Sequence, residues 1–118
     1  MSFVGHVEAR SAETVAIVLE GEIDASVEHE LDELLARAVA LAHPRVIVDL
    51  GEVTYFGCRG AGALIRAWAA ATEAGKTLNV VGANDYIRKL ATTLGIAKML
   101  EPRLQPQRRT GDPLRRRR

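Results

Sequence analysis

Cysteine is nearly absent from this chain, because Cys58 is the only one among 118 residues. A single cysteine excludes an internal disulfide and any metal site built from several cysteines, and it fits a reducing compartment. The three histidines, His6, His29 and His43, do not show the spacing of metal ligands. We therefore expect neither a metal ion nor a cofactor.

Aromatic residues and long apolar runs are also scarce. Aromatic side chains make up only 4% of the residues, so the core must be aliphatic. No apolar run approaches the roughly 20 residues that a membrane-spanning helix needs. The chain also opens without the basic and apolar regions of a secretory signal. These absences predict a cytoplasmic protein with no membrane span.

The net charge of +1 hides a strong asymmetry. Residues 103–118 hold seven arginines and one aspartate, a net charge of +6, which leaves −5 for residues 1–102. The basic segment also contains prolines and too little apolar surface to offset chain entropy. We expect a folded domain over residues 1–101 and a disordered basic tail over residues 102–118. No aromatic residues interleave the arginines, so we expect no specific nucleic-acid recognition.

Hydrophobic periodicity predicts strands that alternate with helices. The expected elements are strands over 3–8 and 13–20, a helix over 26–42, a strand over 45–50, a helix from about 58 to 75, a strand over 77–81 and a helix from 84 to 95. Gly21 is expected to end the second strand, and residues 96–100 to form a last short strand or turn. The predicted inward residues are Leu64, Ile65, Trp68, Ala71 and Thr72 on the second helix, and Ile87, Leu90, Ala91 and Leu94 on the third.

This order of elements indicates an α/β fold. Helices between strands favour right-handed crossovers and a mostly parallel sheet, while the first two strands can pair as an antiparallel hairpin. The predicted architecture is therefore β-β-α-β-α-β-α, with the helices flanking the sheet.

The stretch from Val53 to Leu64 places a thiol and a guanidinium at the start of a helix of small residues. Unpaired backbone amides and the helix dipole favour anions or a thiolate at such a position. The chain carries no nucleophile–base–orienter set, no paired-carboxylate site and no Gly-x-x-x-x-Gly-Lys phosphate loop. We therefore predict that the protein is not an enzyme.

Four segments stand at intervals typical of one family: Leu19–Asp24, Val46–Val53, Tyr55–Leu64 and Thr93–Ile96. Together they resemble STAS domains, and most closely the bacterial anti-sigma-factor antagonists. The resemblance covers about residues 4–101 and implies the STAS fold. In that family, a partner anti-sigma factor that is also an ATP-dependent kinase phosphorylates a serine in the turn Asp-Ser-Ser-Gly. The unphosphorylated antagonist binds this partner and frees the sigma factor.

The resemblance also assigns positions to the residues of that turn. The aspartate falls on Gly57, the acceptor serine on Cys58, the second serine on Arg59 and the glycine on Gly60, while Asp24 matches an acidic residue in the loop beside the acceptor. Phosphoryl transfer needs a hydroxyl in an ion-organising environment, which a thiol beside a glycine does not supply. The resemblance thus implies a module that binds an anti-sigma factor or related ATPase kinase through these five residues, without the serine switch.

Four other interpretations remain open. Cys58 beside Arg59 at a helix start could act as a redox-responsive thiol. Any disulfide would then join two molecules, either two copies of the chain in a homo-oligomer or the chain and another molecule in a mixed adduct. Cys58 could equally be a small residue that fills the space of a serine. STAS-like subunits also occur in lipid-transport complexes, which allows an accessory role in such a transporter. The arginines of the tail could bind nucleic acid or anionic lipid by charge alone.

Overall fold

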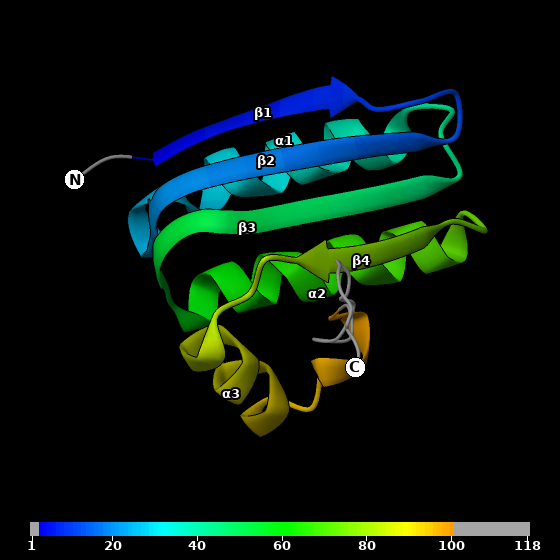
Figure 1. The fold of residues 1–118 in the computed structure, drawn as a ribbon. Helices are drawn as coiled ribbons and strands as arrows, with labels where there is room; N and C mark the ends of the chain where they lie inside the picture. The colour runs from blue at the N-terminus through cyan, green and yellow to red at the C-terminus, as the bar shows by residue number, and fades with distance from the viewer. Residues whose placement is uncertain (1–2, 101–118) are drawn as a thin grey trace, which may run out of the picture.

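The computed structural model describes residues 3–100, which form a four-stranded sheet and its helices (Figure 1). In chain order the elements are β1 (Phe3–Ala9), β2 (Thr14–Ile23), the 3₁₀ turn η1 (Ala25–Val27), α1 (Glu28–Ala40), β3 (Arg45–Phe56), α2 (Cys58–Glu73), β4 (Thr77–Val81), α3 (Asp85–Thr93) and the 3₁₀ turn η2 (Ala97–Met99). The predicted β-β-α-β-α-β-α order is confirmed. The predicted tail, residues 102–118, lies outside the described residues.

The strands lie in the order β1-β2-β3-β4. β1 pairs antiparallel with β2, as the predicted hairpin requires, and both β2–β3 and β3–β4 are parallel. The ends of β2, β3 and β4 therefore lie at the same edge of the sheet, at the left in Figure 1, and each leads into a helix there. We call this side, where residues 23–28, 56–60 and 81–85 lie, the carboxyl edge.

Both central strands run further than the sequence predicts. β2 continues through Gly21 to Ile23, and β3 continues past Leu50 to Phe56, so the predicted ends of these strands were wrong. Gly21 stays in the strand with a φ of 96°, and the pairing with β3 shifts register twice over residues 18–22. Bulges of this kind absorb extra residues and bend a strand. The glycine that reads as a strand break therefore acts as a bend within the sheet.

The core lies between the sheet and two helices, α1 and α2, which both lie behind the sheet in Figure 1. Alternate residues of the parallel strands face these helices and are buried: Val15, Ile17, Leu19, Val46, Val48, Leu50, Leu78 and Val80. From α1, Leu31, Leu35 and Ala38 meet them. Each large aliphatic side chain buried in this way contributes about 1.5–3 kcal/mol, so this layer supplies most of the stability.

α2 turns small side chains inward. Its buried residues are Gly60, Ala61, Ala63, Leu64, Ala67 and Ala71. The predicted stripe was wrong at Ile65 and Thr72, which are exposed. The side of the helix that carries glycine and alanine can approach its neighbours more closely. The closer packing outweighs the larger apolar area that burial of the other side would provide. Trp68 is half-buried at the border of the core, and the Lys98 ammonium lies 5.0 Å from the centre of its ring.

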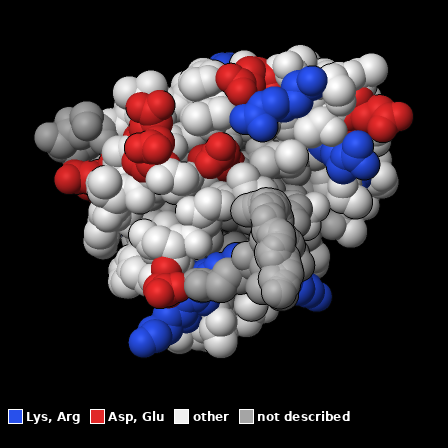
Figure 2. Space-filling model, in the orientation of Figure 1, with Lys and Arg blue, Asp and Glu red and all other residues white. Residues whose placement is uncertain are grey.

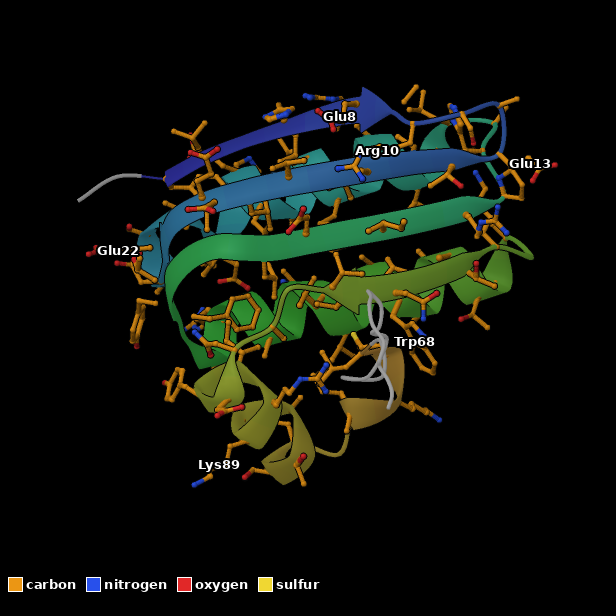
Figure 3. All side chains as sticks on the ribbon, in the orientation of Figure 1. Glu8, Arg10, Glu13, Glu22, Trp68 and Lys89 are labelled. Atoms are coloured by element: carbon orange, nitrogen blue, oxygen red, sulfur yellow. The ribbon has the colours of Figure 1, made fainter. Side chains whose placement is uncertain are left out.

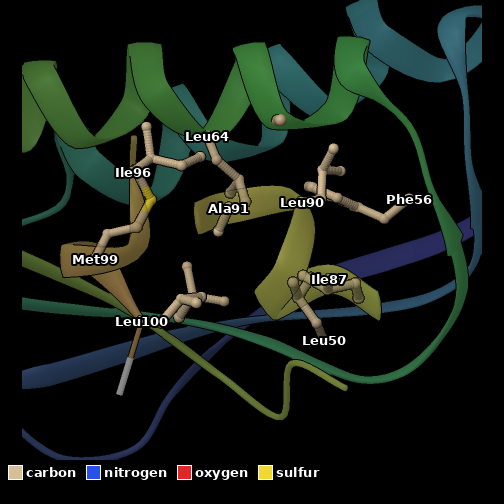
Figure 4. A pocket seen from close by; sticks show the side chains of 11 residues that line it. Leu50, Phe56, Leu64, Ile87, Leu90, Ala91, Ile96, Met99 and Leu100 are labelled. Atoms are coloured by element: carbon tan, nitrogen blue, oxygen red, sulfur yellow. The ribbon is translucent and has the colours of Figure 1, made fainter. Parts of the chain in front are cut away.

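α3 and η2 close the far end of the core beside β4. Ile87 and Ala91 are buried, whereas Leu94, predicted to face inward, is 42% exposed. Leu100 then forms a parallel bridge to Val80. An apolar cavity of about 10 Å³ remains between α3, η2 and the sheet (Figure 4). A cavity of this size, lined only by apolar side chains, is a packing defect and offers no room for a ligand.

Candidate functional site

The carboxyl edge brings together the two segments that carry the predicted site residues. The backbone amide of Gly57 donates a hydrogen bond of 3.0 Å to the carbonyl of Ile23. This bond ties the start of α2 to the end of β2, although the two residues are far apart in the sequence. Asp24 follows Ile23 directly, so it lies beside the segment from Gly57 to Gly60. The structure thus gathers all five predicted residues at one edge of the sheet.

Asp24 shapes the loop that leads into α1. Its carboxylate accepts hydrogen bonds from the Ser26 amide at 3.0 Å and from the Ser26 hydroxyl at 2.6 Å. These bonds hold the pKa of Asp24 below its usual range, and the bond from the Ser26 hydroxyl has the larger effect. The sequence predicts one continuous helix over residues 26–42. In the structure Asp24 caps η1, and α1 begins only at Glu28.

Cys58 is the first residue of α2, and it is exposed. Gly57 precedes it as the N-cap and makes no side-chain cap bond, while the Ala61 amide donates to the Gly57 carbonyl at 3.1 Å. Within residues 3–100, no side chain caps this helix start at its N-cap position. The first amides of a helix have no intrahelical acceptor, so the start of α2 offers hydrogen-bond donors to a partner.

Tyr55 covers Gly57. A Cβ at position 57 would lie 3.2 Å from the Tyr55 hydroxyl and 3.3 Å from its ring. The backbone of Gly57, with φ −94° and ψ −179°, is one that any residue adopts, so conformation does not require glycine here. A side chain at this position would instead require the tyrosine to shift by a few tenths of an ångström. Tyr55 is 47% exposed, and the sequence did not identify it as part of the site.

Gly60 marks the closest contact of α2 with the sheet. A Cβ on Gly60 would lie 2.7 Å from a methyl carbon of Ile23 and 3.0 Å from the ring of Phe56. Both neighbours are buried, with 0% and 2% exposure, so neither can move aside freely. The glycine is therefore required by packing, and it keeps the exposed Cys58 close to Asp24.

An ion-pair network joins the first turns of α1 and α2. Glu28 accepts hydrogen bonds from Arg59 at 3.0 Å and from Arg66 at 2.9 Å, and Arg66 also pairs with Asp32 at 2.9 Å. Arg59 and then Arg66 hold the pKa of Glu28 below its usual value. Because Arg59 is engaged by Glu28, much of its positive charge is compensated there.

Sequence reasoning missed Glu28, Asp32 and Arg66. The sequence does contain a hint of this network. Two acidic residues stand four apart on one predicted helix and two arginines stand seven apart on another, so each pair lies on one side of its helix. Neither pair shows which helices lie side by side.

Two further features concern membranes and metals. Among residues 3–100, no helix is both long enough and apolar enough to cross a bilayer. The same part of the chain holds no group of three or more His, Cys, Asp or Glu side chains arranged to bind a metal ion.

Comparison with known proteins identifies the same fold in regulatory proteins of bacteria. The family model described as "Mlab, STAS domain" matches residues 6–102. An anti-sigma factor antagonist from Mycobacterium paratuberculosis is 24% identical, with a TM-score of 0.77, over 88% of this chain and 89% of that one. The antagonist SpoIIAA in its unphosphorylated form is 16% identical, with a TM-score of 0.72, over 83% and 86% of the two chains.

Another similar structure shares this arrangement. SpoIIAA of Bacillus in its phosphorylated form is 17% identical, with a TM-score of 0.68, over 83% of this chain and 89% of that one. No curated protein matches the sequence. At these identities the solved structures establish the fold, and the family model establishes the relationship.

We expect Gly60→Ala to destabilise the protein by about 1–3 kcal/mol, because the added methyl overpacks a buried contact with Ile23 and Phe56. Urea denaturation measures this loss. Gly62→Ala in the same helix is the matched control, since a Cβ there meets only an Arg66 nitrogen at 3.5 Å. That control should gain about 0.5–1 kcal/mol from helix propensity. Equal effects of the two substitutions would contradict the packing argument.

The free energy of unfolding should depend on the ionisation of Glu28. Its pKa is lowered in the folded state by Arg59 and Arg66, so this stabilisation is present above the unfolded pKa of about 4.3. It is lost as the pH falls through the lower folded pKa. Glu28→Gln should therefore flatten the decline of stability between about pH 5 and pH 3 in urea titrations.

Glu30→Gln is the control for this titration, because Glu30 lies on the same helix, is exposed and has no recorded ion pair within residues 3–100. It should retain the decline seen in the native chain. Parallel curves for Glu28→Gln and the native chain would show that the network adds nothing.

Proposed function

The chain belongs to the STAS domain family, whose model it matches over residues 6–102, and on that basis we propose that it is a non-enzymatic regulatory module that binds an anti-sigma factor or a related ATPase kinase. The observation that carries the proposal is the bond between Gly57 and Ile23, which unites the Asp24 loop and the start of α2 in one exposed place. The named antagonists with this fold, among them SpoIIAA, support the choice of partner.

The proposed contact face consists of Asp24, Gly57, Cys58, Arg59 and Gly60. Asp24 contributes a carboxylate held in place by Ser26, and the start of α2 contributes backbone donors. Arg59 pairs with Glu28, but its side chain is 68% exposed, so a partner protein can still contact it. Gly60 contributes by packing, because it lets the other residues come together.

This face would bind without a phosphorylation switch. Cys58 presents a thiol where phosphoryl transfer needs a hydroxyl, and Gly57 provides no carboxylate beside it. A Cβ at position 57 would lie 3.2 Å from the Tyr55 hydroxyl, so a side chain there requires a small shift of this exposed tyrosine. Binding would then be governed by the amounts of the two proteins and by whatever else competes for the face.

The same feature supports a second candidate, an accessory subunit of a lipid transporter. A docking subunit of this kind needs no phosphoacceptor, and the chain has cysteine in place of the serine. Capture of a transporter component in place of an anti-sigma factor would favour it.

Reversal of the charge at Asp24 should weaken binding to a kinase-type anti-sigma factor of the same organism. We expect Asp24→Lys to lose at least about tenfold in affinity, or about 1.4 kcal/mol, in calorimetric titration. Asp24→Asn separates charge from loop shape, because asparagine caps a helix as well as aspartate does. Glu30→Lys, on the outer side of α1, should leave the affinity unchanged. Unaltered binding by Asp24→Lys would exclude this face.

The native chain should stay unmodified when incubated with such a kinase and ATP. Intact-mass spectrometry should show no added phosphate, because position 58 lacks a hydroxyl. The double variant Gly57→Asp, Cys58→Ser restores both groups of the family turn and is the positive comparison. Phosphate on the native chain would overturn the proposal of an unswitched module.

A further inference from the structure

The sheet has one face that no described helix covers. α1 and α2 both lie behind the sheet in Figure 1. α3 contacts the core through residues such as Ile87 and does not cover the opposite face of the sheet. The opposite face consists of the alternate residues of each strand, and Val18, Ile47 and Val81 on it are only half-buried. We call this side of the sheet the open face.

The open face is acidic toward the carboxyl edge. Glu20 on β2 lies directly opposite Glu52 on β3, and Glu22 follows two residues further along β2. All three are exposed. Figure 2 shows acidic side chains gathered over this half of the face, and Figure 3 places Glu22 at the end of β2. Carboxylates on neighbouring strands repel each other by Coulomb interaction.

Nothing in residues 3–100 compensates these three carboxylates. At the other end of the sheet, Glu8 pairs with Arg10 at 2.8 Å and Glu13 pairs with Arg45 at 3.4 Å. Among the described residues, no ion pair is recorded for Glu20, Glu22 or Glu52. The acidic excess of residues 1–102, a net charge of −5, is therefore not neutralised where it is most concentrated on this face.

We propose that the arginine-rich segment 103–118 of the same chain docks on the acidic end of the open face. The segment carries seven arginines and a net charge of +6, so it is opposite in sign to the three carboxylates and has more than enough arginines to pair with each of them. Arginine forms forked hydrogen bonds with carboxylates and loses less solvation than lysine on doing so. The aliphatic parts of its side chains can also cover half-buried residues such as Val18 and Ile47.

The length and starting point of the segment allow this docking. Leu100 bridges to Val80 in the parallel sense, so the described chain ends beside β4 and runs toward the carboxyl edge there. Two strand spacings of about 4.8 Å and about four residues of strand separate Leu100 from Glu52, or roughly 15–20 Å. Eight residues of extended chain span up to about 26–29 Å, so Arg108 and Arg109 can reach Glu52 and, one strand further on, Glu20. The later arginines, Arg115 to Arg118, have the length of chain needed to reach Glu22.

The docked segment would border the contact face proposed above. Glu22 lies two residues before Asp24, and its position in β2 pairs with that of Tyr55 in β3. An arginine held at Glu22 would therefore reduce access to the Asp24 loop, so a competing partner would have to displace the segment. Only this regulatory consequence rests on the proposed function, because the docking itself involves one chain and needs no partner.

Paramagnetic relaxation in the isolated full chain tests the docking. A nitroxide attached in the variant Cys58→Ser, Thr110→Cys should broaden the amide resonances of Glu20, Glu22 and Glu52 in a ¹⁵N-labelled sample. The loss of peak intensity should be present at about 10 mM salt, where the Debye length is about 30 Å, and absent at about 1 M salt, where it is about 3 Å. No selective loss at these three residues would overturn the proposal.

Two variants and one mixture complete the experiment. Conversion of Glu20, Glu22 and Glu52 to Gln should abolish the broadening, and a well-dispersed spectrum would show that this variant is folded. Conversion of Glu30 and Glu33 on α1 to Gln should leave the broadening intact. Loss of the broadening when Glu30 and Glu33 are converted would overturn the choice of the open face as the docking surface. A mixture of ¹⁵N chain without nitroxide and unlabelled chain with nitroxide should show none, and broadening there would mean that the segment binds a second molecule.

Discussion

The close contact between the start of α2 and the end of β2 is the constraint on which the rest of this structure depends. The Gly57 amide bonds to the Ile23 carbonyl, and Gly60 leaves no space for even a methyl group against Ile23 and Phe56. A helix can approach this closely only where its side chains are minimal. The small residues at the start of α2 are therefore a packing requirement first. Their consequence is that Asp24 and the exposed Cys58 become neighbours.

Ion pairs on the surface also hold the starts of α1 and α2 together. Glu28 lies between Arg59 and Arg66 and so joins the first turns of α1 and α2 above the packed contact. Arg59, which the sequence presents as a positive charge beside the thiol, thereby serves as a link between helices. Among residues 3–100, Glu20, Glu22 and Glu52 at the end of the open face make no ion pair. The sequence of residues 103–118 adds seven arginines. Apolar packing and local ion pairs thus position the candidate site, while long-range charge is available for its regulation.

Much of the fold could be predicted because its signals are local. Alternation in β1 and β2, helical spacing in α1 and the β-branched run in β3 each report the environment of a short segment. The prediction was wrong where contacts with residues distant in the sequence determine the end of a strand or the buried side of a helix. β3 extends to Phe56 because β2 continues beside it through Gly21, and α2 buries alanines in place of Ile65 because α1 and the sheet accept only a small surface. The partners of Glu28 stand 31 and 38 residues away, a separation that no periodicity reveals.

By itself the sequence determined the α/β class and the order of elements. Its resemblance to a family predicted the positions Gly57 to Gly60, aligned with the family turn, and Asp24, aligned with the loop beside it. The sequence also determined that position 58 carries no phosphoryl-accepting hydroxyl, because this depends on one side chain alone. Only the tertiary structure decided that these positions meet at one edge, that Tyr55 covers Gly57 and that Arg59 pairs with Glu28. These facts are distances between segments, and distances follow from how side chains of different elements pack together.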